Sequence, residues 1–116
     1  MSELTLKETE SHRDSDGLIH VVSTVSDDRF DYYKIEFVPG ENRCFANFNV
    51  SETENNDWSP LLNGFIKFDG CMQFYYAEEN QCGPFHICGL ESVKKFNFLL
   101  ESIFELGKKY IPEWDE

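Results

Sequence analysis

The sequence predicts an α+β fold: a mainly antiparallel sheet of five to six strands, with one long C-terminal helix packed on one face of the sheet. Short runs rich in β-branched and aromatic residues, separated by turn residues, fill most of the chain and are typical of strands. One long segment with helical periodicity follows them. Strands followed by a helix, rather than alternating with helices, indicate the α+β class. The 116 residues suit a single domain spanning 1–116.

The first two predicted strands are residues 3–12 and 17–26. Asp16-Gly17 lies between them, and this dipeptide is typical of a β-hairpin turn. The first run is polar after Leu6, so we expect it to be an edge strand or a frayed arm. His12 and His20 lie on these two runs and belong to no recognised motif.

The next two predicted strands, residues 32–38 and 44–50, alternate in polarity. Tyr33, Ile35 and Phe37 fall on one face of the first. Cys44, Ala46, Phe48 and Val50 fall on one face of the second, which is the cleanest alternating segment in the chain. Both patterns predict strands with one buried face.

Residues 51–64 break this alternation and are predicted to form the longest loop, with a helical turn over residues 59–62. Pro60 suits the first position of such a turn. Long ordered loops often carry function. We therefore predict that a partner binds here and at the acidic turn in residues 77–84. The predicted binding residues are Glu52, Glu54, Asp57, Trp58, Glu78 and Glu79.

The final segments are a hairpin, a turn, a short strand and the helix. Asp69-Gly70 separates the runs 65–68 and 71–76 and predicts a type I′ hairpin turn. Residues 77–84 follow as a turn and 85–88 as a strand. Residues 89–110 form the predicted helix. Its expected buried stripe is Val93, Phe96, Leu100, Ile103, Phe104 and Gly107.

Aromatic residues at the alternate positions of the strands pose a question about the second face of the sheet. Phe45, Phe65, Tyr75 and Phe85 lie opposite the expected inner residues. A single helix covers only one face, so some of these side chains are expected to be exposed. An exposed aromatic patch is typical of an interface, unless another segment covers it.

Charge is the strongest global feature. With 22 acidic and 10 basic residues, the net charge is −12. Such a field repels nucleic acids and anionic membranes and attracts basic partners, although acidity also serves solubility alone. The N-terminal residues show no apolar signal segment, so we expect a cytoplasmic protein with reduced cysteines.

The segment 69–91 contains the side chains most suited to metal or thiol chemistry. Cys71, Cys82, His86 and Cys88 are the residue types of a tetrahedral zinc site. Their spacing lacks the paired C-x-x-C pattern of such sites, and small cysteines also pack in strands as weak hydrophobes. We predict no bound metal or cofactor, and treat this cluster as the alternative site.

The function predicted from these patterns is binding rather than catalysis. No nucleotide-binding, zinc-protease or hydrolase motif is present in the sequence. An acidic protein of this size would suit an immunity or inhibitor protein directed against a basic protein, or a nucleic-acid mimic. The alternative is a small metal-binding or thiol-dependent protein that uses the cysteine cluster.

Overall fold

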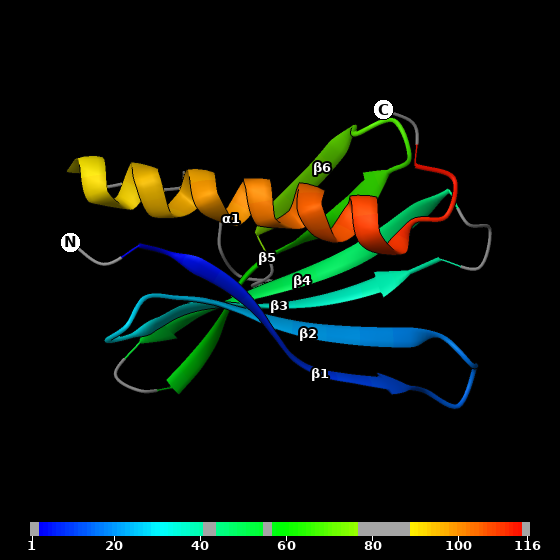
Figure 1. The fold of residues 1–116 in the computed structure, drawn as a ribbon, viewed down its shortest axis with the longest axis horizontal. Helices are drawn as coiled ribbons and strands as arrows, with labels where there is room; N and C mark the ends of the chain where they lie inside the picture. The colour runs from blue at the N-terminus through cyan, green and yellow to red at the C-terminus, as the bar shows by residue number, and fades with distance from the viewer. Residues whose placement is uncertain (1–2, 41–43, 55–56, 77–88, 115–116) are drawn as a thin grey trace.

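The fold is a six-stranded antiparallel sheet with one long helix against it, which is the predicted α+β class (Figure 1). The computed structural model describes residues 3–40, 44–54, 57–76 and 89–114. In chain order the elements are β1 (Thr5–Arg13), β2 (Ile19–Ser26), β3 (Asp31–Pro39), β4 (Phe45–Glu54), β5 (Asp57–Lys67), β6 (Met72–Tyr76) and α1 (Gly89–Tyr110).

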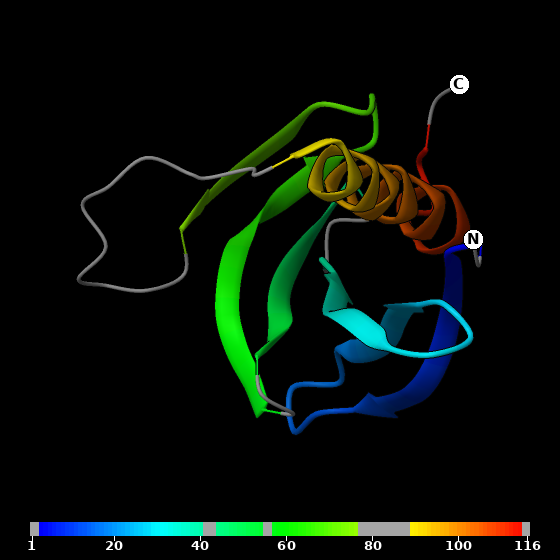
Figure 2. The same cartoon turned by 90° about the vertical axis from the view of Figure 1, so that its left-hand side faces the viewer.

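The strands form a simple meander in which each strand pairs with the next, in the order β1-β2-β3-β4-β5-β6. The sheet curls strongly, and α1 lies across its open side (Figure 2). The helix contacts mainly β3 and β5. We call the face toward α1 the inner face and the opposite one the outer face. Among the described residues, no helix combines the length and the apolarity needed to cross a membrane.

The inner face forms the hydrophobic core, as the alternation in the sequence predicts. Ile35 and Phe37 of β3 and Ala46 of β4 are fully buried. Phe48 and Val50 of β4 are almost fully buried. The remaining buried apolar side chains of the core are Val21, Val25, Leu62, Ile66, Leu99, Ile103, Leu106 and Ile111. β1 pairs only with β2 within the sheet, so it is the edge strand expected from its polarity.

Both Asp-Gly hairpins are present, but the turn at Asp69-Gly70 is not the predicted type I′ turn. Gly70 has a φ of 84°, and its N–H donates to the carbonyl of Lys67 at 2.9 Å. Gly17 has a φ of 85°, and its N–H donates to the carbonyl of Asp14 at 3.0 Å. Each turn therefore has two central residues followed by a left-handed glycine, the three-residue loop rather than type I′.

The predicted long loop 51–64 is wrong, because this segment is mostly strand. β4 continues to Glu54 and β5 begins at Asp57, and these two residues pair with each other. Pro60 lies within β5 rather than opening a helical turn. It follows a register shift, where Val50 pairs with Leu62 but Ser51 pairs with Pro60. Proline has no N–H group and cannot donate a ladder hydrogen bond. It is therefore tolerated within a sheet at a bulge, where the ladder is interrupted.

The predicted buried stripe of α1 is correct only in part. The buried residues of the helix are Leu99, Ser102, Ile103, Leu106 and Gly107. Of the other expected residues, Phe96, Leu100 and Phe104 are half-buried, and Val93 is exposed. The apolar surface of the helix is wide, and its centre lies closer to Leu99 and Leu106 than the spacing alone indicates.

The outer face keeps part of its aromatic surface exposed. Tyr75 is 60% exposed, whereas Phe45 and Phe65 are half-buried. Phe85, the turn 77–84 and the strand 85–88 lie outside the described residues.

Candidate functional site

Two segments bring acidic residues together at one end of the sheet, at the left in Figure 1. They are the β2–β3 connection and the paired ends of β4 and β5. The Thr53 hydroxyl donates to the carbonyl of Asp31 at 2.6 Å and so ties the hairpin to the start of β3. We call this surface the acidic end and define it by its residues: Asp27, Asp28, Phe30, Asp31, Glu52, Asp57 and Trp58.

Asp27 holds the β2–β3 connection together. One carboxylate oxygen accepts the backbone N–H groups of Arg29 and Phe30, both at 2.8 Å. The other accepts the Tyr32 hydroxyl at 2.6 Å. The Tyr32 hydrogen bond, followed by the two backbone hydrogen bonds, lowers the pKa of Asp27 from 3.8 to about 2. This carboxylate is therefore charged at neutral pH and is used within the fold.

The predicted binding residues of the hairpin divide between the two faces of the sheet. Glu52 pairs with Ser59 and lies beside Tyr33, on the inner side of the hairpin. Asp57 pairs with Glu54 and falls on that same side, because alternate strand positions share a face. Trp58 pairs with Thr53 and falls on the outer side. A partner that uses both the charges and the tryptophan must therefore wrap around the hairpin tip.

Two aromatic side chains of the acidic end are open to solvent. Trp58 is 38% exposed, and the ammonium of Lys34 lies 5.0 Å from its ring centroid. Phe30 is 59% exposed, with the guanidinium of Arg29 at 5.6 Å from its ring. Trp58 thus belongs to the surface rather than to the core. Both rings already attract cations of this chain, as cation–π geometry predicts.

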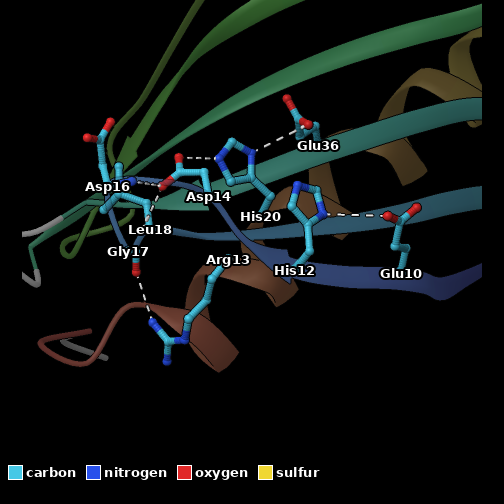
Figure 3. Close-up of polar contacts among 9 residues, drawn as sticks. All are labelled: Glu10, His12, Arg13, Asp14, Asp16, Gly17, Leu18, His20 and Glu36. Atoms are coloured by element: carbon cyan, nitrogen blue, oxygen red, sulfur yellow. Dashed lines mark hydrogen bonds and ion pairs between the residues drawn. The ribbon is translucent and has the colours of Figure 1, made fainter.

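A second cluster of ionisable side chains lies on the outer face near the β1–β2 turn (Figure 3). We call it the histidine cluster: Glu10, His12, Asp14, His20 and Glu36. His12 pairs with His20 across the two strands. Their rings stack at 5.0 Å between centroids and 10° between planes. His20 Nε2 lies 2.7 Å from Asp14 Oδ2, and its Nδ1 lies 3.5 Å from Glu36 Oε2.

Asp14 and His20 shift each other's pKa in opposite directions. The hydrogen bond that His20 donates to Asp14 is the largest cause that raises the pKa of His20 above 6.5, and the Glu36 charge adds to it. The same hydrogen bond is the largest cause that lowers the pKa of Asp14 below 3.8. Asp14 also accepts the backbone N–H groups of Asp16 and Leu18. Both shifts favour the ion pair between a protonated His20 and an ionised Asp14.

The histidine cluster is not built for nucleophilic catalysis. An aspartate that orients a histidine is one half of a catalytic triad, in which the second ring nitrogen must face a nucleophile. Both nitrogens of His20 face carboxylates instead. In the described part of the chain, neither ring nitrogen of His20 is therefore placed to take a proton from a nucleophile.

The metal alternative finds no support in the described part of the chain. In the described ranges, no group of three or more His, Cys, Asp and Glu side chains is arranged to hold a metal ion. Cys71 is exposed in the β5–β6 connection. Cys82, His86 and Cys88 lie outside the described residues, as do the predicted binding residues Glu78 and Glu79.

Two features of these sites were missed in the sequence. Phe30 lies in the turn sequence Asp-Asp-Arg-Phe, where a large apolar residue without an alternating partner is a signal of exposure. His12 and His20 each lie three residues from the loop 15–17, so a three-residue loop pairs them, whereas a two-residue turn at Asp16-Gly17 would not. Searches for similar proteins found no matching family model, curated protein or solved structure.

Proposed function

We propose that this chain is a non-enzymatic binding protein whose acidic end engages a basic protein partner. The observation that carries the proposal is the position of Phe30 and Trp58 among the carboxylates of the acidic end. Charge alone gives fast, weakly specific attraction. Exposed aromatic side chains can supply the binding energy that keeps a complex from dissociating rapidly. An immunity or inhibitor protein against a basic target fits this combination, and a nucleic-acid mimic is the closest variant.

Only a few of the acidic residues of the chain would contact the partner directly. Asp27 already accepts three hydrogen bonds within its own loop, so its charge contributes to the field but its oxygens are occupied. Asp31 and Asp57 are exposed. We assign the direct contacts to these two carboxylates and to the two aromatic rings.

The test begins with capture of partners from a lysate, followed by association kinetics with each captured protein. We expect a basic partner and an association rate that falls steeply with salt, because the Debye length shrinks from ~30 Å at 0.01 M to ~8 Å at 0.15 M. The double variant Asp31→Asn/Asp57→Asn should slow association. Trp58→Ala should mainly raise the dissociation rate.

A matched control separates local contact from net charge. Glu10→Gln/Asp16→Asn removes the same two charges from the β1 side of the sheet, away from the acidic end. This control should retain most of the association rate. An acidic partner, binding that is indifferent to salt, or equal effects of the two double variants would each overturn the proposal.

A further inference from the structure

A cavity of about 380 Å³ lies between the edge strand β1, its neighbour β2 and the C-terminal half of α1. We call it the seam cavity. Its walls include Leu6 of β1 and Leu106 of α1, and Ser23 of β2 faces it from the inner side of the sheet. Ligand pockets typically measure about 300–1,000 Å³, so the seam cavity has a volume that suits a small molecule.

Ser23 is the feature of the seam cavity that the fold itself does not explain. It is fully buried on the inner face, between Val21 and Val25, which are also fully buried. Its hydroxyl has no hydrogen-bond partner among the described residues. Ser102, which is also buried, donates its hydroxyl to the carbonyl of Phe98 at 2.7 Å. A buried hydroxyl without a partner is destabilising, and such exceptions call for a specific explanation.

The rim of the seam cavity is charged but balanced. Glu105 pairs with Lys108 at 3.6 Å, and Glu8 pairs with Lys109 at 3.6 Å. The Tyr110 hydroxyl also donates to Glu8. In a chain of net charge −12, this rim is locally neutral. A charged ligand would have to break one of these pairs, whereas an uncharged ligand leaves both in place.

We propose that the seam cavity binds an uncharged small molecule with a saturated hydrocarbon body and one hydrogen-bonding oxygen, which pairs with the Ser23 hydroxyl. The hydrocarbon body lies between Leu6 and Leu106. Because a serine hydroxyl both donates and accepts, the oxygen of the ligand is an alcohol or a ketone. The site is separate from the acidic end and independent of the function proposed there.

Nuclear magnetic resonance titration of the full chain tests this site with defined probes. Cyclohexanol and cyclohexanone supply the two oxygen types, and methylcyclohexane replaces the oxygen by a methyl group. Cyclohexanecarboxylate and cyclohexylammonium add charge of either sign. We expect the alcohol or the ketone to shift the amide resonances of Leu6, Ser23 and Leu106, with weaker binding of the methyl and charged analogues.

Ser23→Ala should weaken binding of the preferred oxygen probe about fivefold, the fold-change that corresponds to a neutral hydrogen bond of about 1 kcal/mol. It should leave methylcyclohexane unaffected. The protein should stay folded, because the variant removes a hydroxyl that has no partner. The matched control is Ser102→Ala, which should leave probe binding unchanged. As a second variant, Leu6→Phe fills the cavity and should abolish binding of every probe.

Three results would overturn the assignment. One is the absence of resonance shifts at the cavity up to the solubility limit of the probes, which would mean that only water enters it. Another is oxygen-probe binding that Ser23→Ala leaves unchanged. The third is tighter binding of a charged probe than of the neutral alcohol and ketone.

Discussion

Leu99 and Leu100 are adjacent on α1, and truncating each to alanine tests which way the helix faces. Leu99 is fully buried in the core, whereas Leu100 is half-buried. A fully buried Leu→Ala change costs about 2–5 kcal/mol through lost burial and the cavity left behind. We expect Leu99→Ala to fall in that range and Leu100→Ala to cost about 1 kcal/mol, closer to a surface change.

The two variants control for each other because both replace leucine by alanine in the middle of one helix. The change in helix propensity is the same in each and cancels in the comparison. Urea unfolding followed by circular dichroism measures the free energy of unfolding, and matching m-values would show that the denatured state is unchanged. If Leu100→Ala costs as much as Leu99→Ala, the facing of α1 described above is wrong.

Three further predictions concern the sheet and its turns. Gly64→Ala should destabilise the protein by about 1–3 kcal/mol in urea unfolding, because the new Cβ would lie 2.0 Å from a backbone oxygen of β6. Tyr32→Phe should reduce the acid sensitivity of stability. Asp27 has a folded pKa of about 2 against 3.8, so its stabilisation is complete above pH 3.8 and is lost as the pH falls toward 2. His20→Gln should flatten stability near neutral pH. The pKa of His20 is raised above 6.5, so its stabilisation is complete below pH 6.5 and is lost as the pH rises through the folded pKa.

Each of these three changes has a matched control. Gly17→Ala adds a methyl where nothing lies within 4 Å, so only backbone strain remains and the loss should be smaller than at Gly64. Tyr33→Phe should leave the acid limb of the stability curve unchanged, because the hydroxyl bonded to Asp27 is that of Tyr32. His12→Gln keeps the His20–Asp14 contact and should preserve the loss of stability near neutral pH. Reversal of any of these orders would refute the corresponding assignment.

The sequence was sufficient where one physical pattern dominated, and insufficient where two competed. The alternation over Ala46, Phe48 and Val50 fixed the inner face of β4, because a strand has a period of two. At Pro60 the same reasoning failed, since turn residues there outweighed β-propensity, and the bulge that admits proline is set by pairing with β4. In α1, apolar residues cover so wide an arc that the sequence does not define which of them face the sheet.

The histidine cluster could not be predicted from composition, because it is formed by the pairing register of β1 and β2. β1 carries a bulge between Glu8 and Glu10. The bulge turns Leu6 and Glu8 toward the helix while Glu10 and His12 face outward, although all four are even-numbered. A strict alternation would have placed them on one face. One irregularity in the edge strand therefore separates the wall of the seam cavity from the histidine cluster.

Part of the acidity of the chain serves the turns rather than a partner. Asp14, Asp27 and Asp69 each accept a backbone N–H from the residue two positions ahead, in three different connections of the meander. Short carboxylate side chains stabilise turns in this way. Turn stabilisation is therefore sufficient to explain why these three positions are aspartate. Within the described ranges, Asp31 and Asp57 accept no such hydrogen bond, and both lie at the end of the sheet where Phe30 and Trp58 are exposed. For this reason the binding proposal rests on position and neighbours rather than on the net charge, and neutralising Asp31 and Asp57 is its most direct test.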